Sequence, residues 1–385
     1  MGKAQSQDAE LFRETDLIIW DEVSMAHRHL IEALDTGLRD IKNNDTPFAA
    51  KVIVFAGDFR QILPIVKHGS RAQIVNACLK RSRIWHQNIE THHFLINRRL
   101  RLHGIDTNSE DYAQWLLTIG NGTAPTTSNE TYDDLIDIPE HILLEGTKED
   151  LAEWVFPNLE KHYLDAKWMC ERAILTPKNN AVNDINDLMM DRFPLIDGKV
   201  LAQSADKLND EYEAAGIPNE YLNTLNPPGF PPHHLRLKIR MPLMLLRNLD
   251  PSQGLCNGTK LSLKHIYNHM IEVEILGGQH NGKAVCIPRI LLKPKEGEYP
   301  FDWGRCQFPV NVAFAMTINK SQGQTLTRVG IYLPEPVFAH GQLYTGSSRP
   351  SHPNNIRVTV IPSVDSQPTN KTRNIVYTEV IEDTT

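Results

Sequence analysis

The stretch LIIWDEVSM, residues 17–25, decides the fold class that this sequence predicts. Three apolar residues and a tryptophan run directly into two adjacent carboxylates, Asp21 and Glu22. A short, continuous apolar run is typical of a strand buried on both faces, which we expect over 16–20. An acid pair at the end of such a strand can hold Mg²⁺ through water and orient the water that attacks a phosphate. Acids also cap strands without a further role, so this stretch alone leaves both interpretations open.

A second apolar stretch, KVIVFAGD at 51–58, follows a segment in which leucines recur at helical spacing. Ser24 is placed to cap that helix. A strand, an amphipathic helix and another apolar strand form a βαβ unit, so we predict a parallel sheet and an α/β fold. Asp58 and Gln61, in the GDFRQILP that follows, then lie at the same sheet edge as the acid pair. A glutamine there can contact a γ-phosphate or its attacking water.

The remainder of the chain predicts a second α/β region with a β-rich insertion. We expect a helix at 111–122 and a loop or linker at 121–150. A strand, turn and helix are expected at 172–193, a strand and helix at 308–326, and a buried strand at 328–334. After the Pro- and Gly-rich segment 226–234, short apolar runs continue to about residue 300. Short strands at regular spacing predict a small antiparallel barrel inserted in the second region.

Composition is that of a globular protein, with 41% hydrophobic and 23% charged residues among 385. The sequence contains no apolar run of 18 residues, so we expect no membrane span. Five cysteines stand singly, which predicts neither a zinc site nor a disulfide framework. The net charge of −7 argues against bulk nucleic-acid binding. Residues 67–101 nevertheless hold eight Lys or Arg and one acid, which is either an electrostatic footprint or a solvated helix face.

Two later stretches carry groups that suit a phosphate ligand. In TINKSQGQTL, Thr317, Ser321 and the first N–H groups of an expected helix can bind phosphate oxygens of a nucleic-acid backbone, although any polar helix start looks the same. Further donors there are Asn319, Lys320 and Gln322. LYTGSSRP offers Arg349 near the end of a helix-like segment. That arginine is either an ordinary surface residue or an arginine finger for a γ-phosphate.

Seven stretches, in this order, resemble the petite-integration-frequency family of DNA helicases, in particular the eukaryotic branch that includes the helicase of Helitron transposons. They are LIIWDE, GDFRQILP, LINRRL, RAILTPKN, LLRNLDPSQGLCNGTKL, FAMTINKSQGQTL and HGQLYTGSSR. The resemblance extends over nearly the whole chain, from about residue 14 to 360. Two departures are Arg98, where the family usually has Met, and the Thr-Gly-Ser run 345–347, where Val-Ala-Leu is common.

The resemblance implies a superfamily-one motor that uses ATP with Mg²⁺ and translocates 5′ to 3′ on single-stranded DNA and DNA forks. Its fold would be two tandem RecA-like P-loop NTPase domains with parallel sheets, the first incomplete, plus a small SH3-like barrel. The ranges would be 1–96 for the incomplete first domain, 97–227 with 301–385 for the second, and 228–300 for the barrel. We expect a monomer in the nucleus, or alternatively the mitochondrion, that acts in DNA repair, recombination, telomere maintenance or transposition.

Residue roles carry over from the family to the matching positions. Asp21, as the Mg²⁺ ligand, and Glu22 match the Walker B pair, and Gln61 matches the motif III glutamine. Arg99 in INRRL matches the motif IV arginine, and Arg349 matches the arginine finger. The residues expected to bind nucleotide are Asp21, Gln61, Arg99, Gly323 and Arg349. The residues expected to contact DNA are Thr317, Asn319, Lys320, Ser321, Gln322 and, in the barrel, Asn257.

The family's phosphate-binding loop, a GxxGxGKT-type sequence, is expected many tens of residues before LIIWDE, so we expect a chain truncated before that loop. GGQHNGKA at 277–284 satisfies G-x-x-x-x-G-K, but Ala284 stands where Ser or Thr would bind Mg²⁺. It also lies between two apolar stretches, whereas a phosphate loop leads from a strand into a helix. We therefore interpret this stretch as a hairpin loop.

Three hypotheses follow. The first is an ATP-dependent 5′-to-3′ DNA helicase that is incomplete in this chain. The second is a non-hydrolysing relic that at most binds single-stranded DNA, and the third is a gene fragment that folds poorly. ATP hydrolysis that single-stranded DNA stimulates and Glu22→Gln abolishes would support the first.

Overall fold

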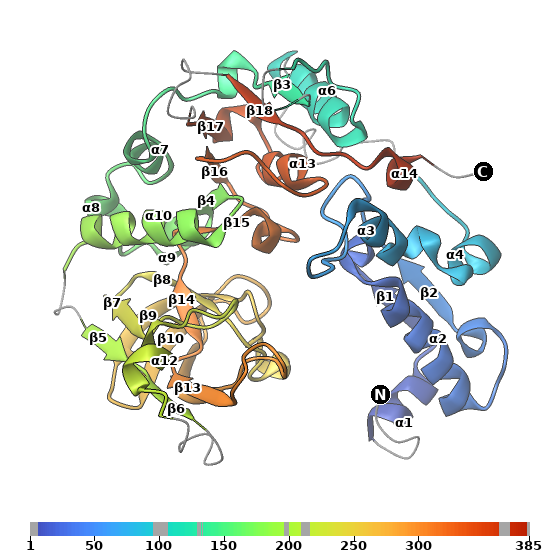
Figure 1. Cartoon of the computed structure of the whole chain (residues 1–385), viewed down its shortest axis with the longest axis horizontal. Coiled ribbons are helices and arrows are strands. Elements are labelled where there is room, and N and C mark those ends of the chain that lie inside the picture. Colours follow the sequence, from blue (N-terminus) through green and yellow to red (C-terminus); the bar gives the residue numbers. More distant parts are fainter. Residues whose placement is uncertain are drawn as a thin grey trace. The chain divides into compact units, whose positions relative to one another are not determined.

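The computed structural model describes residues 7–94, 107–128, 132, 134–195, 200–208, 216–361 and 370–382. The chain divides into two compact units. Unit 1 comprises 1–143, 321–325 and 333–385, and unit 2 comprises 144–320 and 326–332. Figure 1 shows the helices and strands of which they are built. None of the helices in the described ranges is long and apolar enough to cross a membrane.

The N-terminal part of unit 1 contains the predicted βαβ arrangement. Strands β1 (Leu17–Trp20) and β2 (Val52–Phe55) pair in parallel, and α2 (Arg28–Lys42) lies between them in the chain. Helix α2 buries Ile31 and Leu38 in a core with residues of the following segments. The remaining helices of this part are α1 (Gln7–Glu14), α3 (Arg71–Ala77) and α4 (Arg83–Asn88). The prediction of a parallel sheet is confirmed.

The prediction that β1 is buried on both faces is wrong. Leu17 is 50% exposed and Ile19 is 67% exposed, and on β2 Val52 and Val54 are 61% and 46% exposed. Successive side chains of a strand point to opposite faces. Only the face that carries Ile18 packs against the core containing α2. The other face of this two-stranded sheet is therefore apolar and exposed among the described residues.

The expected start of α2 at Ser24 is also wrong. Ser24 is fully buried within a single 3₁₀ turn, η1 (Val23–Met25). The helix begins three residues after this turn, and its cap is His27, whose Nδ1 accepts a hydrogen bond from the His29 N–H at 3.2 Å. Glu22 has left-handed backbone angles, which turn the chain sharply after β1 and delay the helix.

The rest of unit 1 combines segments that are distant in sequence. Helix α6 (Thr107–Asn121) ends before Gly122 at φ +73°, as predicted. Strand β3 (Leu135–Asp137) pairs antiparallel with β18 (Lys371–Arg373). The loop expected over 121–150 therefore contains a strand, whose partner lies too far along the chain to leave a local pattern. The other elements are β17 (Ile356–Val360), α13 (Gln342–Ser347) and α14 (Thr378–Ile381).

Unit 2 contains the second parallel sheet. Strand β4 (Arg172–Thr176) pairs in parallel with β15 (Ala315–Thr317) on one side and β16 (Arg328–Leu333) on the other. Helix α10 (Asn179–Arg192) follows β4, which confirms the predicted strand, turn and helix. Three helices precede β4: α7 (Lys148–Val155), α8 (Leu159–His162) and α9 (Ala166–Cys170).

The β-rich part of unit 2 is antiparallel, as predicted. Its largest sheet has the order β11-β10-β9-β8-β14. These strands are β8 (Pro242–Leu245), β9 (Lys260–Ile266), β10 (Met270–Leu276), β11 (Ala284–Pro288) and β14 (Val310–Val312). The smaller elements are β5 (Val200–Gln203), β6 (Ala205–Leu208), β7 (His234–Leu237), β12 (Ile290–Leu292), β13 (Trp303–Gln307) and α12 (Asn219–Thr224). Because β10 and β11 pair antiparallel, GGQHNGKA is confirmed as a hairpin loop.

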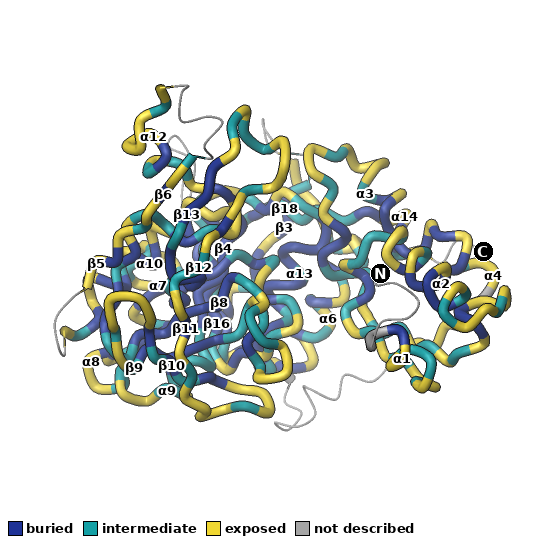
Figure 2. Tube along the Cα trace, turned by 90° about the horizontal axis from the view of Figure 1, so that it is seen from below, coloured by how far each residue is buried: buried dark blue, intermediate teal, exposed yellow. Residues whose placement is uncertain are grey.

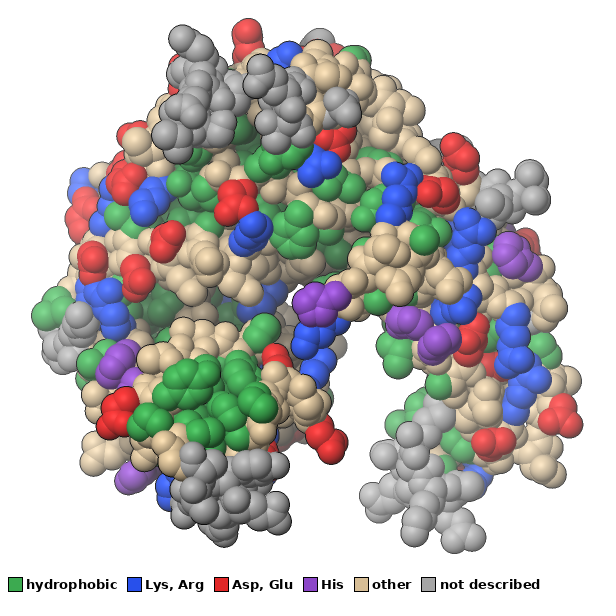
Figure 3. Space-filling model, in the orientation of Figure 1, with side chains coloured by type: hydrophobic (Ala, Val, Ile, Leu, Met, Phe, Trp, Pro, Cys, Tyr) green, Lys and Arg blue, Asp and Glu red, His purple; other side chains and the backbone are tan. Residues whose placement is uncertain are grey.

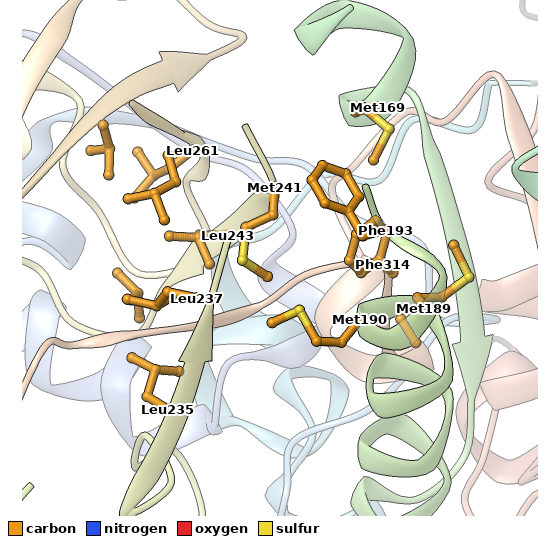
Figure 4. Close-up of a cluster of buried hydrophobic side chains, with 14 of the residues drawn as sticks. Met169, Met189, Met190, Phe193, Leu235, Leu237, Met241, Leu243, Leu261 and Phe314 are labelled. Carbon is orange, nitrogen blue, oxygen red and sulfur yellow. The ribbon is translucent and has the colours of Figure 1, made fainter. Parts of the chain in front are cut away.

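A single apolar core joins α10 to the antiparallel sheet. Met190 of α10 and Phe193, directly after the helix, pack with Leu237, Leu243 and Phe314 in the cluster that Figure 4 shows. In Figure 2 the inner strands of this unit are mostly buried, whereas α12 is mostly exposed. Figure 3 shows hydrophobic side chains gathered over the part that holds α12 and β13. Helix α10 also contacts β4 and β15 of the parallel sheet.

The helix predicted after β15 is wrong. The chain forms only a 3₁₀ turn, η6 (Ile318–Ser321). Gly323 follows with φ +74°, a conformation that a helix cannot include. The polar residues of TINKSQGQTL therefore lie on a turn and an extended segment.

Candidate functional site

Unit 1 contains a cavity of about 720 Å³ that gathers most of the predicted nucleotide site. Its lining includes Asp21, Glu22, Gln61, Gly323 and Arg349. These residues come from the end of β1, the loop after β2, the segment after η6 and the end of α13. The structure thus brings together five predicted residues that the sequence spreads over more than three hundred positions.

The acid pair is held by a strained turn at the end of β1. Glu22 has φ 53° and ψ 37°, a left-handed conformation that costs a residue with a side chain roughly 1–2 kcal/mol. Its N–H donates to Asp21 Oδ1 at 2.9 Å, and the next N–H, of Val23, donates to Ala56 O at 2.9 Å. These bonds hold both carboxylates at the carboxyl end of the sheet, and Asp21 stays exposed.

Gln322 contacts Glu22 directly. The Gln322 Nε2 group donates to Glu22 Oε2 at 2.8 Å. The sequence placed these two residues in different sites, one for DNA and one for nucleotide. In addition, Gln61 Oε1 and Gln322 Oε1 are buried and accept no hydrogen bond from the described part of the protein. Buried oxygens without donors are uncommon, and both side chains belong to the predicted machinery.

The loop that carries Gln61 is fastened by side chains that sequence reasoning missed. Tyr344 of α13 donates its hydroxyl to Asp58 Oδ2 at 2.8 Å, and Asp58 Oδ1 accepts from the Arg60 N–H at 3.0 Å. Arg60 Nε in turn donates to Asn121 Oδ1 at 2.6 Å. Burial, and then the Asp58 carboxylate, raise the pKa of Tyr344 well above its usual range. Tyr344 therefore stays a neutral donor.

His340 bridges the same loop to the C-terminal segment. One ring nitrogen, Nε2, lies 2.8 Å from Phe59 O, and the other, Nδ1, accepts from the Tyr377 N–H at 2.8 Å. Since Nδ1 is an acceptor, the ring is neutral with its proton on Nε2. Burial lowers the pKa of His340, which agrees with that state. The residues HGQLY at 340–344 contain no pattern from which this bridge could have been predicted.

Gly341 allows the two segments to touch. Its φ is +68°, and a Cβ atom there would lie 2.3 Å from Arg60 O and 2.6 Å from Gln61 O. Any other residue would push α13 away from the Gln61 loop. A glycine that immediately precedes a short helix could have suggested this close approach.

Arg349 is buried at the end of α13 and still lines the cavity. Its Nε donates to Thr345 O at 2.9 Å and its Nη2 donates to Ser348 Oγ at 3.0 Å. Its Nη1 donates to Gln324 O at 3.4 Å, so oxygens of α13, of Ser348 after it and of the segment after η6 hold the guanidinium. Its charge is present at the cavity in this arrangement.

The other predicted residues lie elsewhere. Thr317 and Lys320 line a separate cavity within unit 2. Ser321 is buried, Asn319 is half-buried, and Asn257 is exposed in the turn before β9, where its N–H donates to Asn248 Oδ1 at 2.7 Å. Arg99, with Arg98, lies outside the described residues.

Comparison with known proteins shows similarity to one family of helicases. The sequence model of the PIF1-like helicase family matches residues 2–130, and the model of the DNA helicase Pif1 2B domain matches residues 220–265. The chain is 23% identical to the ATP-dependent DNA helicase PIF1 of Xenopus laevis over 348 residues, covering 89% of this chain and 46% of that protein. The chain spans about half the length of the first curated relatives it matches.

Solved structures show the same fold. The Pif1 helicase of Candida albicans matches with 20% identity and a TM-score of 0.59, covering 98% of this chain and 78% of that one. Pif1 helicase from Bacteroides, in complex with ADP-AlF3 and ssDNA, matches with 19% identity and a TM-score of 0.59, covering 97% and 80%. The predicted RecA-like α/β fold is thereby confirmed. With two family models matched and similarity along most of its length, the chain is similar to the PIF1-like helicases.

Proposed function

We propose that this chain carries out part of an ATP-dependent 5′-to-3′ DNA helicase reaction. The observation that carries the proposal is the unit 1 cavity, where an acid pair, a glutamine and an arginine converge. Carboxylates, a water-positioning amide and a guanidinium are the groups that phosphoryl transfer requires. The relatives named as ATP-dependent DNA helicases support the same reaction.

Each group has a distinct role in ATP hydrolysis. Glu22 orients and deprotonates the attacking water, and Gln61 contacts the γ-phosphate or that water. Arg349 stabilises the charge that develops on the transferring group, for which it must turn from Thr345 O toward the cavity. Arg99 and Gly323 complete the nucleotide contacts.

Magnesium fits the residues present. Mg²⁺ is usually bound by one or two carboxylates together with water and substrate phosphates, so it needs no dense cluster of protein ligands. Asp21 is exposed, and within the described part of the protein one of its carboxylate oxygens, Oδ1, accepts a hydrogen bond, from the Glu22 N–H, while the other accepts none. Asp21 would therefore hold the ion, which would neutralise phosphate charge.

Single-stranded DNA and DNA forks are the proposed nucleic-acid partners, and the proposed state is a monomer in the nucleus. Thr317, Lys320 and Asn257 contact the phosphate backbone. The other proposed DNA contacts are Asn319, Ser321 and Gln322. Similar Pif1 helicases, one studied in unwinding forked dsDNA and one solved in complex with ssDNA, support this assignment.

The proposed domain division is 1–96, 97–227 with 301–385, and an SH3-like barrel at 228–300. The match of residues 220–265 to a 2B domain model supports the third part. The antiparallel order of β8 to β11 is compatible with such a barrel.

The test is ATP hydrolysis by the 385-residue chain with and without single-stranded DNA. Hydrolysis that DNA stimulates and Glu22→Gln abolishes supports the helicase proposal. Binding of labelled DNA that weakens steeply with salt, without hydrolysis, supports the alternative of a non-hydrolysing DNA binder. GGQHNGKA lies in a hairpin loop and so does not have the strand-to-helix geometry of a phosphate-binding loop. This observation motivates the alternative. If the chain neither hydrolyses ATP nor binds DNA, both proposals are contradicted.

A further inference from the structure

A second cavity, of about 460 Å³, lies within unit 2 beside the first turns of α10. Residues of α10, of the proline-rich segment 226–232 and of β14 and β15 line it. Its volume is within the range of about 300–1,000 Å³ that is usual for ligand clefts. Thr317 and Lys320 belong to the lining, so the cavity adjoins two of the proposed phosphate contacts.

One wall is a face of α10 rich in asparagine. Asn179, Asn183 and Asn186 follow the spacing i, i+4, i+7 of a helix face, and all three line the cavity. Asn186 is buried and has a structural role. Its Nδ2 donates to Val312 O at 3.2 Å, and its Oδ1 accepts from the Ala315 N–H at 2.9 Å. These bonds fasten α10 to β15.

The asparagines nearer the start of α10 have no such role. Asn179, Asn180 and Asn183 are exposed, and their side-chain amides form no hydrogen bond with the described part of the protein. Asn183 lies inside α10, where asparagine forms helix less readily than alanine or glutamate. Residues that oppose their own secondary structure are expected mainly at functional positions.

Another wall is apolar and held in place. Pro227, Pro228 and Phe230 line it, and proline restricts the backbone of the segment. Arg247 Nη1 donates to Gly229 O at 3.0 Å, and the Arg247 guanidinium carbon lies 5.4 Å from the centre of the Phe230 ring. An aromatic ring fixed in this way is a stacking surface for a planar ligand.

We propose that this cavity receives one base of the single strand and prefers adenine. Asn179, Asn180 and Asn183 read the edge of the base, and Phe230 stacks on its face. The proposal rests on the proposed function, because it assumes that the strand runs past Thr317 and Lys320. An asparagine amide matches the N6 donor and N7 acceptor of adenine, and both groups are accessible when the base is unpaired.

The amide contacts differ from phosphate contacts in their response to salt. Phosphate contacts by Lys release counterions, so their contribution falls with rising salt. Neutral amides release none, so base preference should persist at salt concentrations that weaken overall binding. This difference separates the present proposal from DNA binding in general.

The experiment is fluorescence anisotropy of the full chain with labelled dA and dT strands of about 12 nucleotides, within the site sizes of single-strand binders, over a series of salt concentrations. We expect dA to bind about fivefold or more tightly than dT. The combined variant Asn179→Ala, Asn180→Ala, Asn183→Ala should lose this preference and keep the salt slope. Alanine favours helix, so the variant should fold, and circular dichroism checks this.

Three controls sharpen the result. A strand of 7-deazaadenine stacks like adenine and keeps N6 but lacks N7, and it should bind less tightly than dA. Asn268→Ala removes an exposed amide outside the cavity and should change nothing. Lys320→Ala should reduce the salt slope by about one and leave the base preference intact.

Equal binding of dA and dT by the unaltered chain, or a preference that survives the triple substitution, overturns this proposal while leaving DNA binding intact. Equal binding of adenine and 7-deazaadenine strands by a chain that prefers dA overturns the assigned N7 contact, and the proposal with it. Failure to bind either strand at low salt overturns both this proposal and the proposed DNA contacts.

Discussion

Tyr344 and Asp58 form a hydrogen bond of 2.8 Å between α13 and the loop after β2. The helix that carries the hydroxyl ends beside Arg349, and the loop that carries the carboxylate also carries Gln61. The bond therefore couples the position of the proposed arginine finger to that of the proposed water-positioning glutamine. Neither residue needs to contact nucleotide for its loss to affect hydrolysis.

Tyr344→Phe should destabilise unit 1 by about 1–2 kcal/mol. The change removes a hydrogen bond to a charged group, which is worth roughly 1.5–3 kcal/mol, and partial solvent access to Asp58 reduces that loss. The free energy of unfolding in urea, followed by circular dichroism, measures it. A double-mutant cycle with Asp58→Asn should give a coupling energy of about 1 kcal/mol. Strictly additive effects would show that the two side chains do not interact in solution.

Stability should fall below about pH 6.5 because of His340. Burial lowers the pKa of its ring in the folded protein, while Asp58 and Glu379 oppose that shift and Arg71 adds to it. The unfolded chain therefore binds a proton more readily than the folded chain. The contribution is fully present above the unfolded pKa and is lost as pH falls from there toward the folded value. Thermal unfolding between pH 7.5 and 5 measures the loss.

His340→Gln is the matched control for this pH dependence. Its amide can still donate toward Phe59 O but cannot titrate. The variant should be less stable at pH 7.5 and show a shallower decline below pH 6.5. An identical pH profile would assign the decline to other histidines.

Glu22→Gly should be more stable than Glu22→Ala by about 1 kcal/mol. Both variants lose the same carboxylate, so the difference reports only the backbone, which at φ 53° favours glycine. Asp21 does not have a positive φ, so the variant Asp21→Gly should be less stable than Asp21→Ala. Chemical unfolding of the four variants measures this. The same order at both positions would contradict the strained turn.

Arg305→Leu should destabilise unit 2 by about 3–5 kcal/mol. Arg305 and Asp206 are both fully buried, and the Arg305 Nη2 group lies 2.6 Å from Asp206 Oδ2. Arg305 also donates to Pro231 O and Leu222 O, so it fastens the proline-rich segment beside the second cavity. Removing it leaves an unpaired buried carboxylate. Thermal shift of the full chain measures the effect.

The exposed pair Lys293 and Asp302 provides the comparison for Arg305. Lys293→Leu should change stability by less than about 0.5 kcal/mol, because solvent screens such pairs. A similarly small effect at Arg305 would show that the buried pair does not hold unit 2 together.

Ile19→Thr combined with Val54→Thr should leave the stability of unit 1 unchanged and remove any self-association at high protein concentration. Both side chains are exposed on the apolar face of the two-stranded sheet, and threonine retains the preference for strands. Sedimentation velocity measures association, and thermal unfolding measures stability. Ile18→Thr, on the packed face, should instead destabilise the protein. Equal destabilisation by both changes would mean that the exposed face is covered in solution.

Much of the fold was predictable because it follows from local patterns. The apolar runs at 17–20 and 52–55 predicted two parallel strands. The short apolar runs between the Pro- and Gly-rich segment 226–234 and about residue 300 predicted antiparallel strands. The hairpin at 277–284 was predicted because two apolar stretches flank it. The helix expected after β15 failed because the left-handed Gly323 ends the turn, and glycine alone does not specify that angle.

The candidate site was predictable residue by residue, but its contacts were not. Asp21, Glu22, Gln61 and Arg349 were recognisable from the stretches that contain them, and they line one cavity. Tyr344 was missed because nothing beside it in the chain marks a hydroxyl that bonds a carboxylate 286 residues away. The sequence predicted that Asp58 lies at the sheet edge of the acid pair, but not that it accepts a hydrogen bond from Tyr344.

The sequence by itself therefore determined the order of most elements, the place of the acid pair at a strand end and the resemblance to a helicase family. Only the tertiary structure decided that Gln322 bonds Glu22 across 300 residues, which face of β1 is exposed and where the asparagines of α10 gather. The physical reason is the distance along the chain over which each effect acts. Periodicity and turn chemistry act over a few residues, whereas the pairing of polar groups depends on how distant segments pack.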